Sequence, residues 1–361
     1  MNKKIDHLGA AFALAFGLAA SQASAGTAGL DVQLSTPGQM FKGTQDVPVT
    51  VTVTNNGAAP VRLLKWALPG AKAEGSMFVV KRDGQSVPYL GALYKRAAPT
   101  ADDYVTLAPG EKVSAAVELS ALFDLSQGGH YAISYKAVSA QLVAPAAPAG
   151  STSKTVSPSF GSISSGALDV WMEASATPQA EAPMAACVAG GGITYLQCSS
   201  SRQGALITAV KSAYSMASNA QSYLSKMTGA TTRYTTWWGS YSSAGRDQLK
   251  EHYANEITAL TTKRLQFDCT CTEQNVYAYV YPSSPYRIYL CGAFWAAPNT
   301  GTDSRAGTLI HELSHFTVVA GTDDYAYGQD AAQSLAISNP TRARMNADSH
   351  EYFAENTPAL P

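Results

Sequence analysis

The chain has 361 residues, a length that suggests two domains and a leader segment. Its formal net charge is −1 and only 14 % of its residues are charged, so the composition gives no support for a nucleic-acid-binding protein. No stretch after the leader approaches the ~18 uninterrupted apolar residues of a membrane-spanning helix, so we expect no membrane role.

Residues 1–25 have the features of a secretory signal peptide. Lys3 and Lys4 form a positive start, Leu8–Ala20 is an apolar run, and Ala23–Ala25 fits the small-residue cleavage motif. We therefore expect a secreted protein. Because export leads to an oxidising environment, its five cysteines are expected to form mainly structural disulfides.

Residues 26–143 have the pattern of an all-β domain, in which short alternating runs are separated by turns such as Asn55-Asn56-Gly57 and Pro109-Gly110. The runs are Asp31–Leu34, Val47–Thr54, Met77–Val80, Tyr104–Leu107, Val113–Leu119 and His130–Tyr135. Short strands with turns between them predict an antiparallel sandwich of the immunoglobulin-like type. The region has no residue pattern that points to catalysis, and we interpret it as a packing module.

Residues 144–186 lose this alternation and are predicted to be a linker exposed to proteolysis. Residues 144–159 are rich in Pro, Ala and Ser, and a short strand is possible over 167–172. Lys154 lies in this segment, and the chain has no further lysine before Lys211.

Residues 187–361 change to a helical pattern and predict an α+β domain with a small β-sheet. The expected helices cover about 205–224, 244–260, 326–337 and 348–355, and the expected strands about 276–281 and 287–291.

The stretch that carries the chemistry is His311-Glu312-Leu313-Ser314-His315, an H-E-x-x-H motif. On a helix its two histidines lie one turn apart on one face and can reach a single zinc ion, while Glu312 can act on a zinc-activated water. Asp303 is a plausible N-cap of this helix and Gly321 a plausible stop.

A catalytic zinc normally has a third protein ligand, and the sequence offers several. A metzincin would have Gly at 318 and His at 321, where this chain has Val318 and Gly321. A thermolysin-like ligand would be Glu351 or Glu355. Asp324, just past the helix stop, is nearer in the chain, and spacing alone does not separate it from Asp323.

The motif and the residues after it, 321–328, resemble the aspzincin signature H-E-x-x-H plus G-T-x-D-x-x-Y-G. From about residue 195 to the end, the chain is most similar to the peptidyl-Lys metalloendopeptidases of this family. The stretches that carry the similarity are Arg233–Tyr241, Phe267–Thr272, Leu290–Trp295 and Met345–Asn356.

The resemblance implies roles for individual residues. It implies His311, His315 and Asp324 as ligands of one zinc ion per chain, Glu312 as the general base, and Tyr327 as a hydroxyl donor to the oxyanion.

The resemblance also implies that Asp348 and Glu351 line an S1′ pocket for lysine. Two carboxylates on one helix face would select an ammonium group, so cleavage on the N-terminal side of Lys is expected. An acidic first turn of a helix is the structural alternative for this pair, and His350 between them is expected to be structural.

The disulfide pairs implied by the resemblance are Cys198–Cys269 and Cys271–Cys291. Cys187 then stands outside the matched domain, as a free thiol or lost on processing. A role of its thiolate at the open zinc position is a further, weaker possibility.

A secreted protease with an N-terminal domain is expected to be made as an inactive precursor, with its own pro-domain as inhibitor. Lys154 is the candidate for self-cleavage, and Tyr94-Lys95-Arg96 is a second candidate, a loop lysine that could enter the S1′ pocket. We expect a monomer with protein or peptide substrates. The alternatives are an aspzincin of broader specificity and a secreted binding or adhesion protein with structural zinc.

Overall fold

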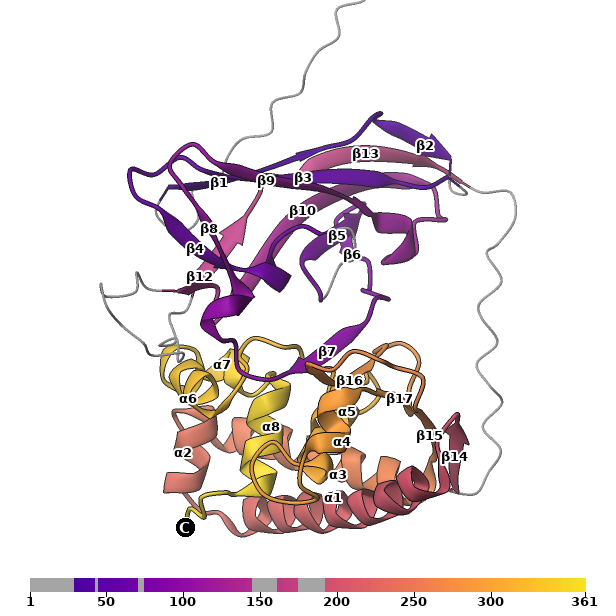
Figure 1. The fold of residues 1–361 in the computed structure, drawn as a ribbon, viewed down its shortest axis with the longest axis vertical. Helices are drawn as coiled ribbons and strands as arrows, with labels where there is room; N and C mark the ends of the chain where they lie inside the picture. The colour runs from indigo at the N-terminus through magenta and orange to yellow at the C-terminus, as the bar shows by residue number, and fades with distance from the viewer. Residues whose placement is uncertain (1–28, 43–44, 71–74, 145–160, 175–191) are drawn as a thin grey trace, which may run out of the picture.

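The protein is described by a computed structural model that covers residues 29–42, 45–70, 75–144, 161–174 and 192–361 (Figure 1). A region of strands from the N-terminal half lies against a mainly helical C-terminal region, so the expected α+β class is confirmed. The leader segment, Lys154 and Cys187 lie outside the described residues. Among the helices of the described part, none is both long and apolar enough to cross a membrane.

The N-terminal strands form three sheets around one apolar core. The first has the order β1-β3-β9, with the bounds Leu30–Ser35, Pro48–Asn55 and Lys112–Glu118. The second has the order β2-β13-β10-β5-β6, with β12 also paired to β10, and the bounds Met40–Lys42, Leu168–Glu173, Gly129–Ser139, Phe78–Arg82, Gln85–Ser86 and Gly161–Ser164. The third has the order β11-β4-β8, with the bounds Val143–Ala144, Val61–Leu64 and Tyr104–Leu107.

Alternation explains why these segments are strands. In β3, Val49, Val51 and Val53 are buried while the threonines between them are half-buried, because successive side chains point to opposite faces. Short 3-10 helices connect some strands, with the bounds Lys65–Ala67, Ala101–Asp103 and Leu119–Ala121. The three-sheet arrangement does not establish the immunoglobulin-like class, which stays a prediction.

Two strands of the sandwich lie within the predicted linker 144–186. β13 agrees with the short strand expected over 167–172, whereas β12 was not predicted. β10 is 11 residues long and needs partners along its whole edge, which β12 and β13 supply. Val170 and Met172 are buried on the core side of β13 while Trp171 is half-exposed. β12 has only four residues, three of them Gly or Ser, which is why its sequence did not indicate a strand.

The C-terminal region contains eight α-helices within the described residues. Their bounds are Ser200–Lys226 (α1), Thr232–Trp238 (α2), Ser243–Thr262 (α3), Gly292–Ala296 (α4), Arg305–His315 (α5), Gln329–Ser338 (α6), Pro340–Ala343 (α7) and Ala347–Glu355 (α8). α1 buries Ala209, Ala213, Ala217 and Ala220 on one side, and these small residues let α3 and α5 pack closely against it.

One sheet joins the two regions. Its order is β14-β15-β17-β16-β7, with the bounds Gly192–Leu196, Arg264–Asp268, Arg287–Leu290, Val276–Val280 and Leu93–Arg96. β7 comes from the N-terminal region and pairs antiparallel with β16, so it lies between the sandwich and the helices (Figure 1). Disulfides Cys198–Cys269 and Cys271–Cys291, the pairs that the resemblance implied, lie in the C-terminal region.

Candidate metal centre and lysine pocket

Helix α5 carries the H-E-x-x-H motif and is buried along its length apart from its first residue. Its N-cap is Ser304, whose Oγ accepts a hydrogen bond from the N–H of Gly307 at 2.9 Å, so the expectation of Asp303 as cap was wrong by one residue. The helix ends at His315, several residues before Gly321, which has a φ of 63°. This earlier stop lets the chain turn back toward the histidines.

The turn brings a carboxylate beside the two imidazoles. Nε2 of His311 lies 3.1 Å from Nε2 of His315. Asp324 places Oδ1 3.2 Å from Nε2 of His311 and Oδ2 3.5 Å from Nε2 of His315. All three side chains are buried or nearly so, and together they could hold a metal ion.

These distances fit zinc. Ligands about 2.0–2.1 Å from a tetrahedral zinc ion are separated from one another by roughly 3.3 Å. The observed separations of 3.1, 3.2 and 3.5 Å lie close to that value. Within the described residues the carboxylate oxygens of Asp324 have no hydrogen-bond donor, which a buried anion tolerates only beside a cation. The donor set of two imidazoles and a carboxylate therefore suits the ion.

The other ring nitrogens of both histidines are held by the protein. Nδ1 of His315 lies 3.0 Å from the backbone oxygen of Thr322. Nδ1 of His311 lies 2.8 Å from Oδ1 of Asp348. Each contact places the proton on Nδ1 and leaves Nε2 free to bind a metal.

Charge in the cluster is complementary. Burial lowers the pKa of His311, but the carboxylate of Asp324 outweighs it and the net pKa is raised. Burial raises the pKa of Asp324, yet the two histidines outweigh it and the net pKa is lowered. The cluster therefore keeps Asp324 ionised and ready to act as a ligand.

The structure places Asp323 and the glutamates away from the two Nε2 atoms. Asp323 turns its side chain to the N–H of Asp324 at 2.9 Å, and burial raises its pKa to about 6. Glu355 accepts hydrogen bonds from the N–H and Oγ of Ser304, at 2.9 and 2.7 Å. Glu351 approaches His311 at Nδ1, 3.5 Å away, on the side opposite the metal-facing nitrogen. Asp324 is therefore the carboxylate in the ligand position.

Glu312 is fully buried, and neither carboxylate oxygen has a hydrogen-bond partner within the described residues. Burial raises its pKa to about 7, a shift that the neighbouring histidines oppose. A carboxylate with free lone pairs and a pKa near neutrality is suited to accept a proton.

Tyr327 lies on the same loop as Asp324 and is buried. Its hydroxyl donates a hydrogen bond to the backbone oxygen of Tyr94 in β7, at 3.0 Å. Its N–H donates to Oε1 of Gln141, so the N-terminal region holds this loop at two points. Burial raises its pKa well above the ordinary value, so the hydroxyl stays protonated and can donate.

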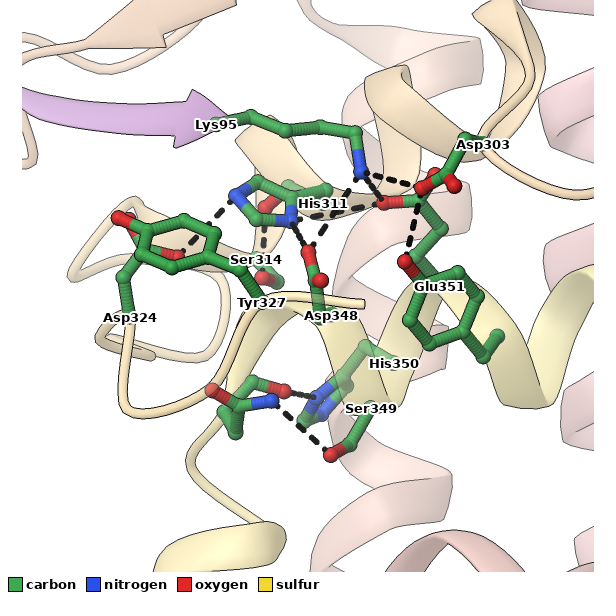
Figure 2. A network of polar contacts seen from close by, with 12 residues as sticks. Lys95, Asp303, His311, Ser314, Asp324, Tyr327, Asp348, Ser349, His350 and Glu351 are labelled. Atoms are coloured by element: carbon green, nitrogen blue, oxygen red, sulfur yellow. Dashed lines mark hydrogen bonds and ion pairs between the residues drawn. The ribbon is translucent and has the colours of Figure 1, made fainter. Parts of the chain in front are cut away.

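Lys95 of β7 reaches into a pocket beside the metal cluster (Figure 2). Its side chain is fully buried, and Nζ donates to Glu351, to Asp348 at 3.5 Å and to Asp303 at 3.4 Å. Burial lowers the pKa of Lys95, but the three carboxylates outweigh it and the net pKa is raised well above its ordinary value. The ammonium group is therefore charged and fully compensated.

Close packing of α8 against α5 builds this pocket. Gly307 makes it possible, because a Cβ at this position would overlap the carboxylate of Glu355. Gly328, with a φ of 84°, donates its N–H to Oδ2 of Asp348 at 2.7 Å and fixes that side chain. His350 points away from the pocket and pairs with His252, at 3.0 Å between ring nitrogens, which agrees with a structural role.

Sequence reasoning missed three residues of the pocket. Asp303 is the third carboxylate, held by the hydroxyl of Tyr352 at 2.7 Å. The rings of Tyr277 and Tyr352 lie 5.1 and 5.9 Å from Nζ of Lys95 and supply aromatic walls for a cation. Asp303 has a left-handed backbone conformation, with a φ of 51°. No local sequence motif predicts this conformation, so the inward position of its side chain could not be foreseen.

Comparisons with known proteins give the family and the relatives that this chain resembles. Residues 223–355 match the family model described as aspzincin, lysine-specific metallo-endopeptidase. The chain is 42 % identical to an extracellular protease of Aeromonas hydrophila over 92 % of this chain and 93 % of that protein. It is 37 % identical to a peptidyl-Lys metalloendopeptidase of Grifola frondosa over 92 % of this chain and 94 % of that protein. A solved zinc peptidase from Grifola frondosa matches 45 % of this chain and 100 % of its own at 53 % identity, with a TM-score of 0.43.

Proposed function

Because the chain belongs to the aspzincin family of zinc metalloendopeptidases, we propose that it is a secreted endopeptidase that cleaves on the N-terminal side of lysine. The observation that carries the proposal is Lys95, whose ammonium group fills an acidic pocket next to the metal cluster. The name of the Grifola frondosa relative, a peptidyl-Lys metalloendopeptidase, and that of the Aeromonas hydrophila relative, an extracellular protease, support it.

The pocket is proposed to select lysine by its positive charge. Three carboxylates surround the position of the ammonium group, and two of them, Asp348 and Glu351, are fully buried. A neutral side chain there would leave those charges desolvated and unpaired, at a cost of about 3–5 kcal/mol. This cost favours lysine over residues that cannot bring a cation to the pocket.

We propose that a substrate lies as β7 does. β7 adds to the edge of β16 through backbone hydrogen bonds, which hold any extended peptide regardless of its side chains. A lysine in the position of Lys95 then occupies the pocket as the first residue after the scissile bond. The carbonyl before it lies where Tyr327 donates its hydroxyl hydrogen bond.

His311, His315 and Asp324 are the proposed zinc ligands. When bound, zinc supplies Lewis-acid chemistry that acidifies a water and polarises the substrate carbonyl. Glu312 accepts the proton of the attacking water and passes it to the leaving amine, as its buried and unpaired carboxylate allows. Tyr327 stabilises the negative charge that develops on the carbonyl oxygen.

The precursor is proposed to be inactive because β7 fills this site. Segment 1–25 would direct export, and the strands up to β13 would form the pro-domain. Lys154 remains the proposed self-cleavage site, because it is the last lysine before the C-terminal region. A cut there leaves β12 and β13 joined to that region, so a second cut after β13 would be needed to release it. The mature enzyme, taken as residues 187–361, would act as a monomer on protein and peptide substrates.

Cleavage sites on one denatured protein test the proposal. The mature enzyme is incubated with an unfolded substrate and the new N-termini are identified by mass spectrometry. The expected result is that nearly all new N-termini are lysine, and that a Glu312→Gln preparation produces none. New N-termini spread over many residue types would instead support an aspzincin of broader specificity, and none at all would support a binding protein with structural zinc.

A further inference from the structure

We propose that the Tyr94–Lys95 peptide bond is itself cleaved by the precursor that contains it, and that the cut chain stays folded as one particle. The inference rests on the proposed function, since it uses the same pocket and the same acid–base residues. It differs from the expected cut at Lys154, because it places a processing site inside the inhibitory strand.

From Leu93 to Lys95 the backbone of β7 keeps one register against β16, and the register shifts between Lys95 and Arg96. Leu93 pairs with Val280, Tyr94 with Tyr279, and Lys95 with Ala278. An antiparallel ladder along a sheet edge fixes each residue of the added strand relative to the site. Lys95 is thus held at the pocket by its backbone as well as by its ammonium group.

The side chain of Tyr94, on the opposite face of β7 from Lys95, also packs against the C-terminal region. Tyr94 packs on Tyr279, with ring centroids 5.1 Å apart, and Tyr279 stacks on Tyr289 at 4.5 Å with nearly parallel planes. Successive residues of a strand point to opposite faces, so Lys95 can fill the pocket while Tyr94 rests on this tyrosine row. The residue before the scissile bond therefore has a subsite of its own.

The carbonyl group of Tyr94 already makes the contact that hydrolysis requires. Tyr327 donates its hydroxyl to this oxygen at 3.0 Å, and the hydroxyl is on the same loop as Asp324. Glu312 has no hydrogen-bond partner within the described residues that would occupy its carboxylate. A hydrogen bond to the oxygen on which charge develops is a feature of a bound substrate.

A cavity lies next to Leu93, the residue before Tyr94, and next to Tyr327. This cavity of about 300 Å³ is lined by residues of both regions, among them Trp66, Leu93, Lys136, Asp324 and Tyr327. Since a water molecule takes about 30 Å³ in the liquid, the cavity can hold several. Of the three proposed zinc ligands, Asp324 lines this cavity.

The step is an ordinary hydrolysis. The oxygen of one water bonds to the carbonyl carbon of Tyr94, and the bond from that carbon to the nitrogen of Lys95 breaks. One proton of the water reaches the departing nitrogen through Glu312. The second proton of the water leaves the new carboxyl group and is taken up by the new amine, so the products are a carboxylate on Tyr94 and an N-terminal ammonium group on Lys95.

The cut does not release the two pieces, because strands on either side of it pair with one another. β3 pairs with β9, β4 with β8, and β5 with β10, and each pair joins the segment before residue 94 to the segment after residue 95. The two pieces also share one core. The cut precursor therefore keeps Lys95 near the pocket and stays latent until the sandwich itself is removed.

The experiment uses the full-length precursor, purified without zinc and then supplied with zinc. Intact mass under denaturing conditions should show one piece that ends at Tyr94 and one that begins at Lys95. Size-exclusion chromatography of the same sample should show both pieces in one peak. The rate of cutting should not change over a tenfold range of precursor concentration, as expected of a bond held within its own chain.

Two variants complete the test. Glu312→Gln should leave the bond intact, and Lys81→Arg, an exposed lysine on β5, should be cut at the wild-type rate. A precursor whose 94–95 bond survives, while its mature form cleaves lysine peptides, overturns the inference and leaves the proposed function standing. A concentration-dependent cut also overturns it, and failure of the mature form on lysine peptides overturns the proposed function itself.

Discussion

Oδ1 of Asp348 lies 2.8 Å from Nδ1 of His311, so one carboxylate belongs both to the lysine pocket and to the support of the metal centre. The same oxygen lies 3.5 Å from Nζ of Lys95. Its pKa is lowered, because Lys95 and His311 outweigh the effect of burial. Asp348 thus stays ionised and can serve both partners.

Asp348→Asn is expected to weaken zinc binding as well as lysine recognition. Loss of such a supporting carboxylate typically lowers metal affinity by about 10- to 100-fold. Zinc affinity of the mature form, measured by competition with a chelating dye, checks this. Unchanged zinc affinity would show that the contact with His311 does not support the metal site.

Asp303→Asn is the matched change at the pocket alone. The side chain of Asp303 contacts Lys95 and Tyr352 and is about one-third exposed, at 36 %. We expect KM for lysine peptides to rise roughly fivefold, in line with about 1 kcal/mol for a partly exposed charge pair, and zinc affinity to stay the same. An unchanged KM would show that Asp303 does not contribute to lysine binding.

Glu312→Gln is expected to lower kcat by roughly a hundred- to ten-thousandfold, the usual contribution of a positioned acid–base group. The amide cannot accept the proton but has nearly the same shape. Zinc content by elemental analysis serves as the control and should remain at one ion per chain. Retained hydrolysis with full zinc would assign the proton transfer to another group.

Lys95→Met should raise the peptidase activity of the uncut precursor. The substitution removes the cation and leaves Asp348 and Glu351 buried without it, which costs about 3–5 kcal/mol of docking energy. Hydrolysis of a small lysine peptide by the precursor should rise by about a hundredfold or more. Lys81→Met, on the exposed side of β5, should leave the latent rate unchanged.

The C-terminal region should become less stable as the pH is lowered, because of the buried His252–His350 pair. Burial lowers the pKa of His252 to about 4 and that of His350 to about 3. Above pH ~6.5 both are neutral in the folded and unfolded states. Between pH ~6.5 and ~4 only the unfolded chain takes up the protons, so a stabilisation on the order of a few kcal/mol is lost.

Urea unfolding at pH 7 and pH 5 measures this loss, in the Glu312→Gln background so that the chain does not digest itself. His252→Gln should reduce the difference between the two pH values, while His130→Gln, on the exposed side of β10, should not. Equal pH dependence in all three proteins would show that the buried pair does not titrate on unfolding.

The parts of the site that depend on local spacing could be predicted from the sequence. His311, Glu312 and His315 follow from the period of a helix. The choice of Asp324 over Asp323 could not be made from spacing, because it depends on which side chain the turn points inward. Only the structure shows that the Asp323 carboxylate accepts a hydrogen bond from the backbone N–H of Asp324.

Features that depend on contacts between residues far apart in the chain could not be predicted from the sequence. Asp303 and Lys95 are separated by 208 positions, yet they meet in one pocket. β12 was assigned to the linker because its burial depends on pairing with β10 and not on its own composition. In each case the signal lies in a partner far away in the chain.

The pairing of β7 with β16 has a consequence for how concentration controls the enzyme. While pro-domain and enzyme are one chain, the blocking strand is present at an effective concentration of roughly millimolar, whatever the dilution of the protein. Once the connection between them is cut, rebinding becomes a reaction between two molecules. Dilution after export would then complete the activation that proteolysis begins.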